Sequence, residues 1–499
     1  MIGLILDDQS FEQDIRELLM AFYPGEGFVH KESPEEAYRL LVRGRTGEAD
    51  FELAIQDFEK GIVSSSSTKV DFTDRFETKN RIKRMLYGMV QELTGIELPW
   101  GTLTGIRPTK IAMTKLLEGY TDGEVRRYMK DTYLTSDGKV DLSLEIARRE
   151  MELISAIDYS RGYSLYVGIP FCPTTCLYCS FTSFPIGQWE KRMEEYLEAL
   201  FKEMDYTAKK MAGRTLDTVY IGGGTPTSLS ALHLDKLIRR MKTTFDFTTV
   251  KEFTVEAGRP DSITIEKLQV LKSHGVSRIS INPQTMKQET LDIIGRRHTV
   301  DMVKDRYSMA RSLGFDNINM DLIIGLPEED MEDVTRTMEE IKALGPDGIT
   351  VHSLAIKRAA RLNMFKEKYG DLKITNTQEM IDLTASYARS MGQEPYYLYR
   401  QKNMAGNFEN VGYSLPGKAC IYNILIMEEK QTIIACGAGT TTKVIFPSEN
   451  RLERVENVKD VEQYIARIDE MLERKEKNAC KIGNVIYNRG MLKIKKITE

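Results

Sequence analysis

One stretch holds three of the six cysteines of the chain and decides the fold: Gly168-Ile169-Pro170-Phe171-Cys172-Pro173-Thr174-Thr175-Cys176-Leu177-Tyr178-Cys179. The C-x3-C-x2-C spacing lets a short loop bring three thiolates onto one iron–sulfur cluster, a group usually held by four. One iron would then lack a protein partner, and an open iron can bind a substrate or cofactor. Buried apolar cysteines or a zinc loop are the alternatives. Zinc ligands usually come in two pairs, and the sequence has no second C-x2-C.

Composition narrows the class of protein. The 499 residues suggest two to four domains, and the net charge of -5, with no long basic block, gives no support for nucleic-acid binding. No run of eighteen apolar residues predicts a membrane span, and the first residues do not read as a signal peptide. Cys420, Cys436 and Cys480 are scattered, which fits a reducing compartment better than a disulfide framework. We therefore expect a cytoplasmic protein.

Two units are expected before the cysteine stretch. Residues 1–62 predict a small α/β unit, with strands at 2–6 and 51–55, apolar residues at helical spacing between them and a helix start at 33–36. The polar run 64–67 reads as a break or linker. Residues 68–158 predict a mostly helical region with a turn near 136–138. Within it, the Gly- and Thr-rich stretch 100–110 makes Arg107 and Lys110 either anion contacts or parts of a structured loop, and the loop is favoured.

Strand-like and helical stretches alternate over residues 160–390, which indicates parallel βαβ units. The predicted strands are 165–169, 218–221, 253–256, 278–281, 317–324 and 348–354. The predicted helices are 189–210, 234–245, 263–274, 300–313 and 330–344. Six such repeats suggest a partial (β/α)6 barrel, whose function sits at the C-terminal ends of the strands. Residues 395–499 predict a separate α+β part that covers the substrate, with strands at 421–427 and 432–435 and a charged helix at 460–477.

Polar groups follow the predicted strands. Gly222-Gly223-Gly224-Thr225 allows close approach of backbone to a ligand, and Glu256 can accept hydrogen bonds from ribose hydroxyls. Gln284 and Arg296 follow the fourth strand, the fifth strand carries Asp321, and Ala355 follows the sixth. Each is weak evidence alone, and their convergence on an open iron is the stronger signal.

With these motifs together, the chain resembles the radical S-adenosylmethionine (SAM) superfamily, and more closely the oxygen-independent coproporphyrinogen III oxidase family. The motifs are CPTTCLYC, GGGTPT, VEA, RISINPQ and MDLIIGLP, and the resemblance covers roughly residues 160–445. Within that family, the chain is most similar to the coproporphyrinogen-dehydrogenase-like branch that carries an extra N-terminal region.

The resemblance implies the site by position. Cys172, Cys176 and Cys179 would bind a [4Fe–4S] cluster, and one or two SAM molecules would bind beside it. Tyr166, Gly223 and Glu256 would contact the first SAM. The second would meet residues from several strand ends: Tyr178, Gly224, Thr225, Gln284, Arg296, Asp321 and Ala355. Tyr178 and Arg296 are also candidates to support the chemistry, which derives from SAM itself.

The family's reaction removes a hydrogen atom from a propionate of coproporphyrinogen III by a 5′-deoxyadenosyl radical, after which carbon dioxide leaves and a vinyl group remains. The implied partners are a tetrapyrrole and a reducing flavodoxin- or ferredoxin-like electron donor; the oligomeric state is left open. Four carboxylates on the substrate call for basic residues, and the candidates are Arg358, Arg361, Arg400 and Lys402. Residues 399–407 form a candidate lid, and Gly437-Ala438-Gly439 could let backbone approach SAM.

Three departures from the family keep alternatives open. Gly168 stands where a His is common, Phe181 stands where a fourth Cys is found, and residues 1–160 replace the usual N-terminal arm. A heme chaperone of the same family is one rival, although Tyr422 stands where its His would be; Cys420 could ligate heme iron or, as we favour, be a buried apolar residue. A redox-sensing cluster protein is a third reading, which the GGGTPT loop, Glu256 and Asp321 disfavour.

Overall fold

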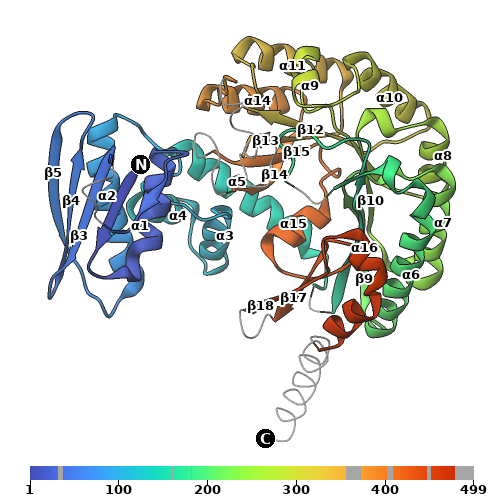
Figure 1. Ribbon diagram of the computed structural model, residues 1–499, viewed down its shortest axis with the longest axis horizontal. Coiled ribbons are helices and arrows are strands. Elements are labelled where there is room, and N and C mark those ends of the chain that lie inside the picture. Colours follow the sequence, from blue (N-terminus) through green and yellow to red (C-terminus); the bar gives the residue numbers. More distant parts are fainter. Residues whose placement is uncertain are drawn as a thin grey trace, which may run out of the picture.

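The computed structural model describes residues 1–31, 37–159, 161–180, 183–355, 372–401, 408–446 and 451–477. An N-terminal α/β unit, a helical connector and a large sheet wrapped by helices follow one another along the chain (Figure 1). Several expectations fall outside the described residues: the helix start at 33–36, Phe181, Arg358, Arg361, Lys402 and most of the candidate lid.

The N-terminal unit contains the predicted strands at 2–6 and 51–55, and further strands that the sequence analysis did not predict. Its sheet has the order β2-β1-β3-β4-β5. The strands are β1 (Ile2–Leu6), β2 (Phe28–Val29), β3 (Leu40–Thr46), β4 (Asp50–Asp57) and β5 (Ile62–Lys69), and the helices are α1 (Glu12–Phe22) and α2 (Arg75–Thr94). The predicted linker at 64–67 is wrong: these serines lie in β5 and pair antiparallel with residues 52–55 of β4. Serine side chains suit an edge strand with one exposed face and one half-buried face against α2, and their polarity hides the strand from a hydrophobicity pattern.

Three helices connect this unit to the large sheet: α3 (Thr109–Leu117), α4 (Asp122–Tyr133) and α5 (Asp137–Ser155). The loop before α3 is fixed by buried contacts. A Cβ on Gly101 would lie 2.1 Å from the Tyr133 carbonyl oxygen, and the Trp100 indole donates to Glu409 Oε2 at 2.8 Å. Arg107 donates to the Met427 carbonyl at 2.8 Å and pairs with Glu429 at 2.7 Å. The structured-loop interpretation is therefore confirmed for Arg107.

The predicted partial barrel is confirmed. Its parallel strands adjoin one another in chain order: β6 (Gly162–Ile169), β9 (Thr215–Gly223), β10 (Glu252–Gly258), β11 (Arg278–Ile281), β12 (Ile318–Ile324) and β13 (Gly348–Ser353). The helices that follow these strands along the chain cover the outer face (Figure 1): α6 (Met193–Lys210), α7 (Ala231–Thr244), α8 (Ile265–Ser273), α10 (Val300–Ser312), α11 (Met331–Leu344) and α14 (Gln378–Ser390). Strands that read as near-continuous apolar runs are typical of a parallel sheet covered by helices.

The C-terminal strands extend this same sheet, so the expectation of a separate C-terminal part is wrong at the level of the sheet. In the described part of the chain, an 11-stranded sheet runs β14-β15-β13-β12-β11-β10-β9-β6-β16-β17-β18. The added strands are β14 (Glu394–Tyr399), β15 (Asn410–Ser414), β16 (Thr432–Cys436), β17 (Thr441–Phe446) and β18 (Arg451–Glu456). The charged helix begins at α16 (Val461–Ala466).

The predicted strand at 421–427 is also wrong, since this segment is helix α15 (Ile421–Glu428). The carboxylate of Glu252, from β10, accepts hydrogen bonds from the backbone N–H groups of Ile421 at 2.6 Å and Tyr422 at 3.2 Å. A buried carboxylate at that end satisfies the free N–H groups of a helix start. A short run that is apolar on all sides cannot be assigned to strand or helix by periodicity alone.

Candidate cluster and cofactor site

The three cysteines lie directly after the first barrel strand, at the carboxyl edge of the sheet. Cys172 belongs to the short strand β7 (Phe171–Cys172), and the backbone N–H of Leu177 donates to the Ile294 carbonyl at 2.9 Å. Cys172 and Cys176 are 9% and 7% exposed, and Cys179 is half-buried. Burial raises the pKa of the Cys172 thiol, so this group becomes a ligand only when a metal displaces its proton.

The arrangement of possible ligands does not suit a single metal ion. Within the described ranges, no three His, Cys, Asp or Glu side chains gather around one point as mononuclear zinc requires. The cysteines of these ranges are all free thiols.

The glycine loop after β9 packs directly against the cysteine loop. The Gly224 N–H donates to the Ile169 carbonyl at 2.8 Å, and the Thr225 N–H donates to the Phe171 carbonyl at 2.7 Å. A Cβ on Gly224 would lie 2.6 Å from the Phe171 carbonyl oxygen and 2.9 Å from Cys172 Sγ. Only glycine fits there, so backbone N–H and C=O groups reach the edge of the cluster loop, where a bound cofactor would need them.

Glu256 lies on β10 beside this loop, with its side chain half-buried. It accepts a hydrogen bond from the Tyr220 hydroxyl at 2.6 Å and another from the Gly223 N–H. Burial, and then the nearby charge of Asp321, raise its pKa to about 7, although the Tyr220 hydrogen bond opposes the rise. Such a carboxylate can accept further hydrogen bonds, and the hydroxyl groups of a ribose would be suitable donors.

An aromatic stack adjoins Glu256. The Tyr220 and Tyr422 rings lie 4.5 Å apart between centroids, and the Tyr166 ring lies 5.9 Å from Tyr220. The stack joins β6, β9 and α15, so the C-terminal helix completes the wall beside the predicted SAM contacts. Its packed rings keep water from this side of the carboxylate.

A second polar group joins the cysteine loop to the fourth strand. The Tyr178 hydroxyl donates to Gln284 Oε1 at 2.8 Å, and Arg296 Nη2 donates to the Tyr178 oxygen at 3.1 Å. Gln284 has φ +72°, a left-handed conformation that is uncommon for any residue but glycine. Strain of this kind persists where the surroundings fix it, and it clusters at functional sites.

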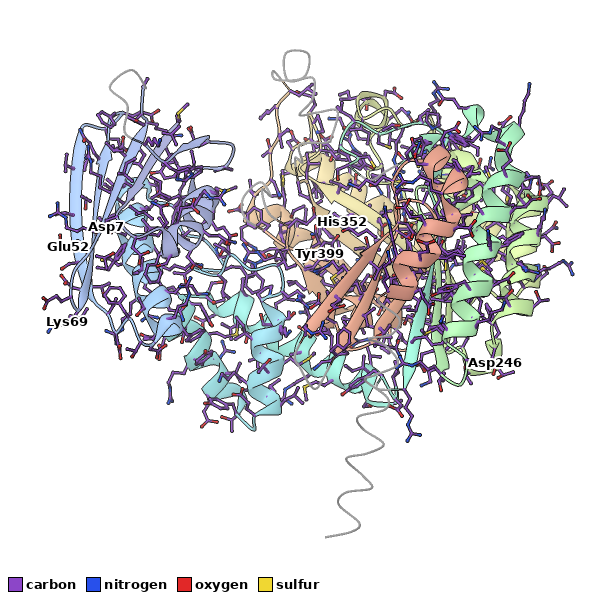
Figure 2. The ribbon with its side chains drawn as sticks, turned by 60° about the horizontal axis from the view of Figure 1, so that its bottom comes forward. Asp7, Glu52, Lys69, Asp246, His352 and Tyr399 are labelled. Carbon is purple, nitrogen blue, oxygen red and sulfur yellow. The ribbon has the colours of Figure 1, made fainter. Side chains whose placement is uncertain are left out.

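Residues of the fifth and sixth barrel strands, β12 and β13, continue the site beyond Gln284. Gln284 Nε2 donates to the Asp321 carbonyl at 3.2 Å, and the His352 Nε2 atom lies 4.0 Å from Asp321 Oδ2. The Tyr399 hydroxyl and His352 Nδ1 are 3.3 Å apart, and Figure 2 shows both residues on the barrel side of the molecule. Ala355 is half-buried just after β13. The structure thus brings the predicted residues of successive strand ends to one edge of the sheet.

The expectation that Arg400 binds substrate carboxylates is wrong. Its side chain is 4% exposed, its Nη1 donates to the Leu103 carbonyl at 2.7 Å, and its guanidinium stacks over Trp100 at 5.7 Å from the ring centroid. Burial lowers its pKa to about 10. Arg400 therefore fastens the end of β14 to the loop before α3.

Arg400→Ala is expected to lower the free energy of unfolding by about 2–3 kcal/mol, because a buried carbonyl loses its donor and Trp100 loses its packing. Urea unfolding of the cluster-free protein measures this loss. Arg161→Ala, at a side chain that is 83% exposed, is the control and should change little. Unchanged stability of Arg400→Ala with a weaker apparent affinity for substrate would restore the substrate-binding role.

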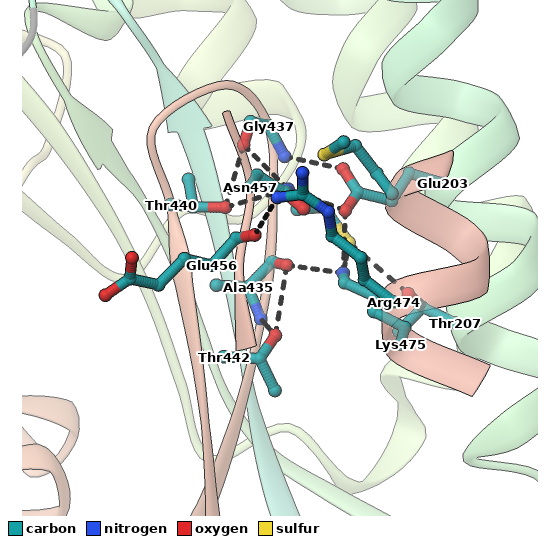
Figure 3. A network of polar contacts seen from close by, with 12 residues as sticks. Glu203, Thr207, Ala435, Gly437, Thr440, Thr442, Glu456, Asn457, Arg474 and Lys475 are labelled. Carbon is teal, nitrogen blue, oxygen red and sulfur yellow. Dashed lines mark hydrogen bonds and ion pairs between the residues drawn. The ribbon is translucent and has the colours of Figure 1, made fainter. Parts of the chain in front are cut away.

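The turn at 437–440 lies against the strand that leads into the cysteine loop. A Cβ on Gly168 would lie 2.4 Å from Thr440 Cγ2, which explains why this chain has no larger residue there, and a Cβ on Gly437 would lie 2.4 Å from the Gly168 carbonyl oxygen. The backbone that Gly437 approaches closely is thus that of Gly168, whereas the sequence analysis expected this turn to approach SAM. Glu203 holds the turn by accepting from the Gly437 N–H at 2.8 Å and pairing with Lys475 at 2.7 Å, within the buried network in Figure 3.

Cys420 matches the buried interpretation. It is fully buried, and its thiol donates to Glu252 Oε1 at 3.3 Å. Burial raises its pKa far above the ordinary value. A heme iron has no access to this sulfur without movement of α15.

Two contributors to the site, Tyr220 and Arg259, escaped the sequence analysis. Alternation along β9 puts Tyr220 on the face of Gly222, so the strand period contained a signal for Tyr220. Arg259 contacts the cysteine loop from a position more than eighty residues later, and no local pattern predicts that contact.

Comparison with known proteins agrees with this geometry. Residues 166–341 match the Radical SAM superfamily. The chain is 42% identical over 403 residues to the oxygen-independent coproporphyrinogen-III oxidase-like protein HemZ of Bacillus subtilis, covering 80% of each chain. It is 39% identical over 198 residues to the heme chaperone HemW of the same organism, covering 39% of this chain and 51% of that protein.

Among solved structures, the chain resembles coproporphyrinogen III oxidase (HemN) from Escherichia coli, with a TM-score of 0.51 and 22% identity. The match covers 64% of this chain and 72% of that one. At this identity the likeness concerns the fold. No helix among the described residues is long and apolar enough to cross a membrane.

Proposed function

Because this chain belongs to the oxygen-independent coproporphyrinogen III oxidase-like family of radical SAM proteins, we propose that it decarboxylates propionates of coproporphyrinogen III to vinyl groups, giving protoporphyrinogen IX. The observation that carries this proposal is the convergence of the cysteine loop, the glycine loop and Glu256 at one sheet edge. Membership of the superfamily implies a [4Fe–4S] cluster and SAM.

The residues present fit these groups. Cys172, Cys176 and Cys179 would hold the cluster, and Tyr166, Gly223 and Glu256 would hold SAM beside it. A second SAM would meet the group around Arg296: Tyr178, Gly224, Thr225, Gln284, Asp321 and Ala355. When bound, the reduced cluster and SAM supply a radical that takes a hydrogen atom from an unactivated carbon.

The protein's own residues would bind and orient SAM and the tetrapyrrole and would exclude water from them. Ionised Glu256 would accept hydrogen bonds from ribose hydroxyls, and the Tyr220 hydroxyl fixes its direction. The tyrosine stack excludes water beside it, so hydrogen bonds made there are stronger than in solvent. His352 and Tyr399 offer polar atoms on the opposite side of the edge, where a tetrapyrrole would lie. Arg358, Arg361 and Lys402 remain candidates for its carboxylates from sequence alone.

The test is anaerobic. The cluster is reconstituted, SAM and a reducing flavodoxin or ferredoxin are added, and 5′-deoxyadenosine and carbon dioxide are measured with and without coproporphyrinogen III. We expect both products to rise with the tetrapyrrole, at a fixed ratio. If SAM cleavage does not change with coproporphyrinogen III but increases with another tetrapyrrole, that tetrapyrrole would replace coproporphyrinogen III as the proposed substrate.

A heme chaperone is the second candidate, since the chain is 39% identical to one over part of its length. Buried Cys420 and Tyr422 do not offer it a heme ligand. Tight, stoichiometric heme binding without release of carbon dioxide would favour this role. Free thiols throughout the described residues suit either activity in a reducing, cytoplasmic setting.

A further inference from the structure

Arg259 reaches the cysteine loop from the end of the third barrel strand. Its Nη1 donates to the Thr174 carbonyl at 2.9 Å and to Thr174 Oγ1 at 2.7 Å, and it lies 3.8 Å from Cys176 Sγ. The other edge of the guanidinium is held by Asp261, which accepts from Nε at 3.0 Å and from Nη2 at 2.6 Å. The forked contact fixes the direction of the charge, which a lysine could not do as well.

The surroundings make this charge effective. Arg259 is 3% exposed, so solvent screens it little. Arg296 also faces Cys176, but it bonds Tyr178 and is already expected to meet SAM. His298 is fully buried close by, and burial followed by the charge of Arg296 lowers its pKa to about 3, so it stays neutral. Arg259 and Asp261 therefore form a charged pair beside Cys176 to which the proposed function assigns no role.

We propose that Arg259 is a positioning residue that fixes the cysteine loop and raises the reduction potential of the cluster bound there. The inference rests on the cluster of the proposed function, but not on its substrate. Reduction adds a negative charge to the cluster, and a buried cation beside a ligand sulfur stabilises the reduced form. Asp261 offsets part of this effect while it holds the guanidinium in place.

The test is a redox titration of the reconstituted full-length protein, followed by electron paramagnetic resonance without SAM or substrate. Arg259→Gln removes the cation and is expected to shift the midpoint potential to a more negative value. The ratio of reduced to oxidised cluster at a fixed potential should fall up to tenfold, which corresponds to about 59 mV for one electron. Asp261→Asn leaves the cation and removes the anion, so it is expected to shift the potential in the opposite direction. Arg259→Lys should stay closest to the native value.

A purely structural role predicts a different pattern, since both neutral variants would then loosen the loop and shift the potential the same way. That result, or an unchanged potential in Arg259→Gln, would overturn the inference. Arg311→Gln is the matched control, because it breaks an Arg–Asp pair of 2.7 Å with Asp347, which precedes the start of β13, whereas the cysteines follow the end of β6. A native protein with these shifts but no decarboxylation would overturn the proposed substrate and leave the role of Arg259 standing.

Discussion

Replacing Cys176 with Ala is expected to leave a folded protein that holds no stable [4Fe–4S] cluster and no longer cleaves SAM. Only two cysteine ligands would remain in the loop, and members of a catalytic unit fail together, so cleavage should fall by at least about 10³-fold. The stability cost should be only about 1 kcal/mol, because the substitution removes a single sulfur atom from a short side chain. Iron content, the visible absorbance of the cluster and 5′-deoxyadenosine formation measure the three quantities.

The matched control for this prediction is Cys420→Ala. Cys420 is as fully buried as any cysteine of the described residues, but it contacts Glu252 and lies outside the cysteine loop. It should keep native iron content and native SAM cleavage. Full cluster occupancy in Cys176→Ala would contradict the assignment of the ligands.

Glu256→Gln is expected to weaken SAM binding and, at the same time, to stabilise the cluster-free protein at alkaline pH. A lost hydrogen bond to a charged acceptor is worth about 1.5–3 kcal/mol, or roughly 10- to 150-fold in Kd. The pKa of Glu256 is raised from 4.5 to about 7, so between these values the folded state binds more protons than the unfolded state. Native stability therefore falls as pH rises through this window, and the carboxylate costs at most about 3 kcal/mol above it.

Urea unfolding at pH 5 and pH 8 tests the second half of this prediction. The variant should exceed the native protein in stability at pH 8, and the gap should narrow at pH 5. Glu289→Gln, at an exposed carboxylate of the same edge, should show no such gap. Tyr220→Phe removes the hydrogen bond that favours the ionised form, so it should raise the folded-state pKa of Glu256 and move the upper end of this pH window upward. Equal stability of Glu256→Gln and native protein at both pH values would refute the raised pKa.

The sequence predicts the barrel and its cysteine loop well, for a physical reason. Parallel strands buried on both faces are short apolar runs with helices between them, and the catalytic groups follow each strand directly. The glycine loop at the end of β9, and the carboxylates of Glu256 and Asp321 within β10 and β12, could therefore be found from their position in or after such runs. Local pattern and tertiary position agree there.

The failures are all places where a distant partner decides the local structure. Helix α15 depends on Glu252 at its start, and the serine strand β5 depends on pairing with β4. Arg400 was a candidate substrate contact because the four carboxylates of the expected substrate call for basic residues, but the loop at 100–106 buries it. None of these three partners is visible from within the segment that it controls.

The pairing of β16 with β6 has a consequence for the order of biosynthesis. Residues 432–436 and the turn at Gly437 and Thr440 support the strand that leads into the cysteine loop, yet the ribosome makes them about 250 residues after Cys179. During that interval the nascent chain carries its cysteines beside an unfinished sheet. A cluster delivered before release would meet ligands without their supporting wall. Iron–sulfur delivery is therefore expected to follow translation and to act on a completed chain.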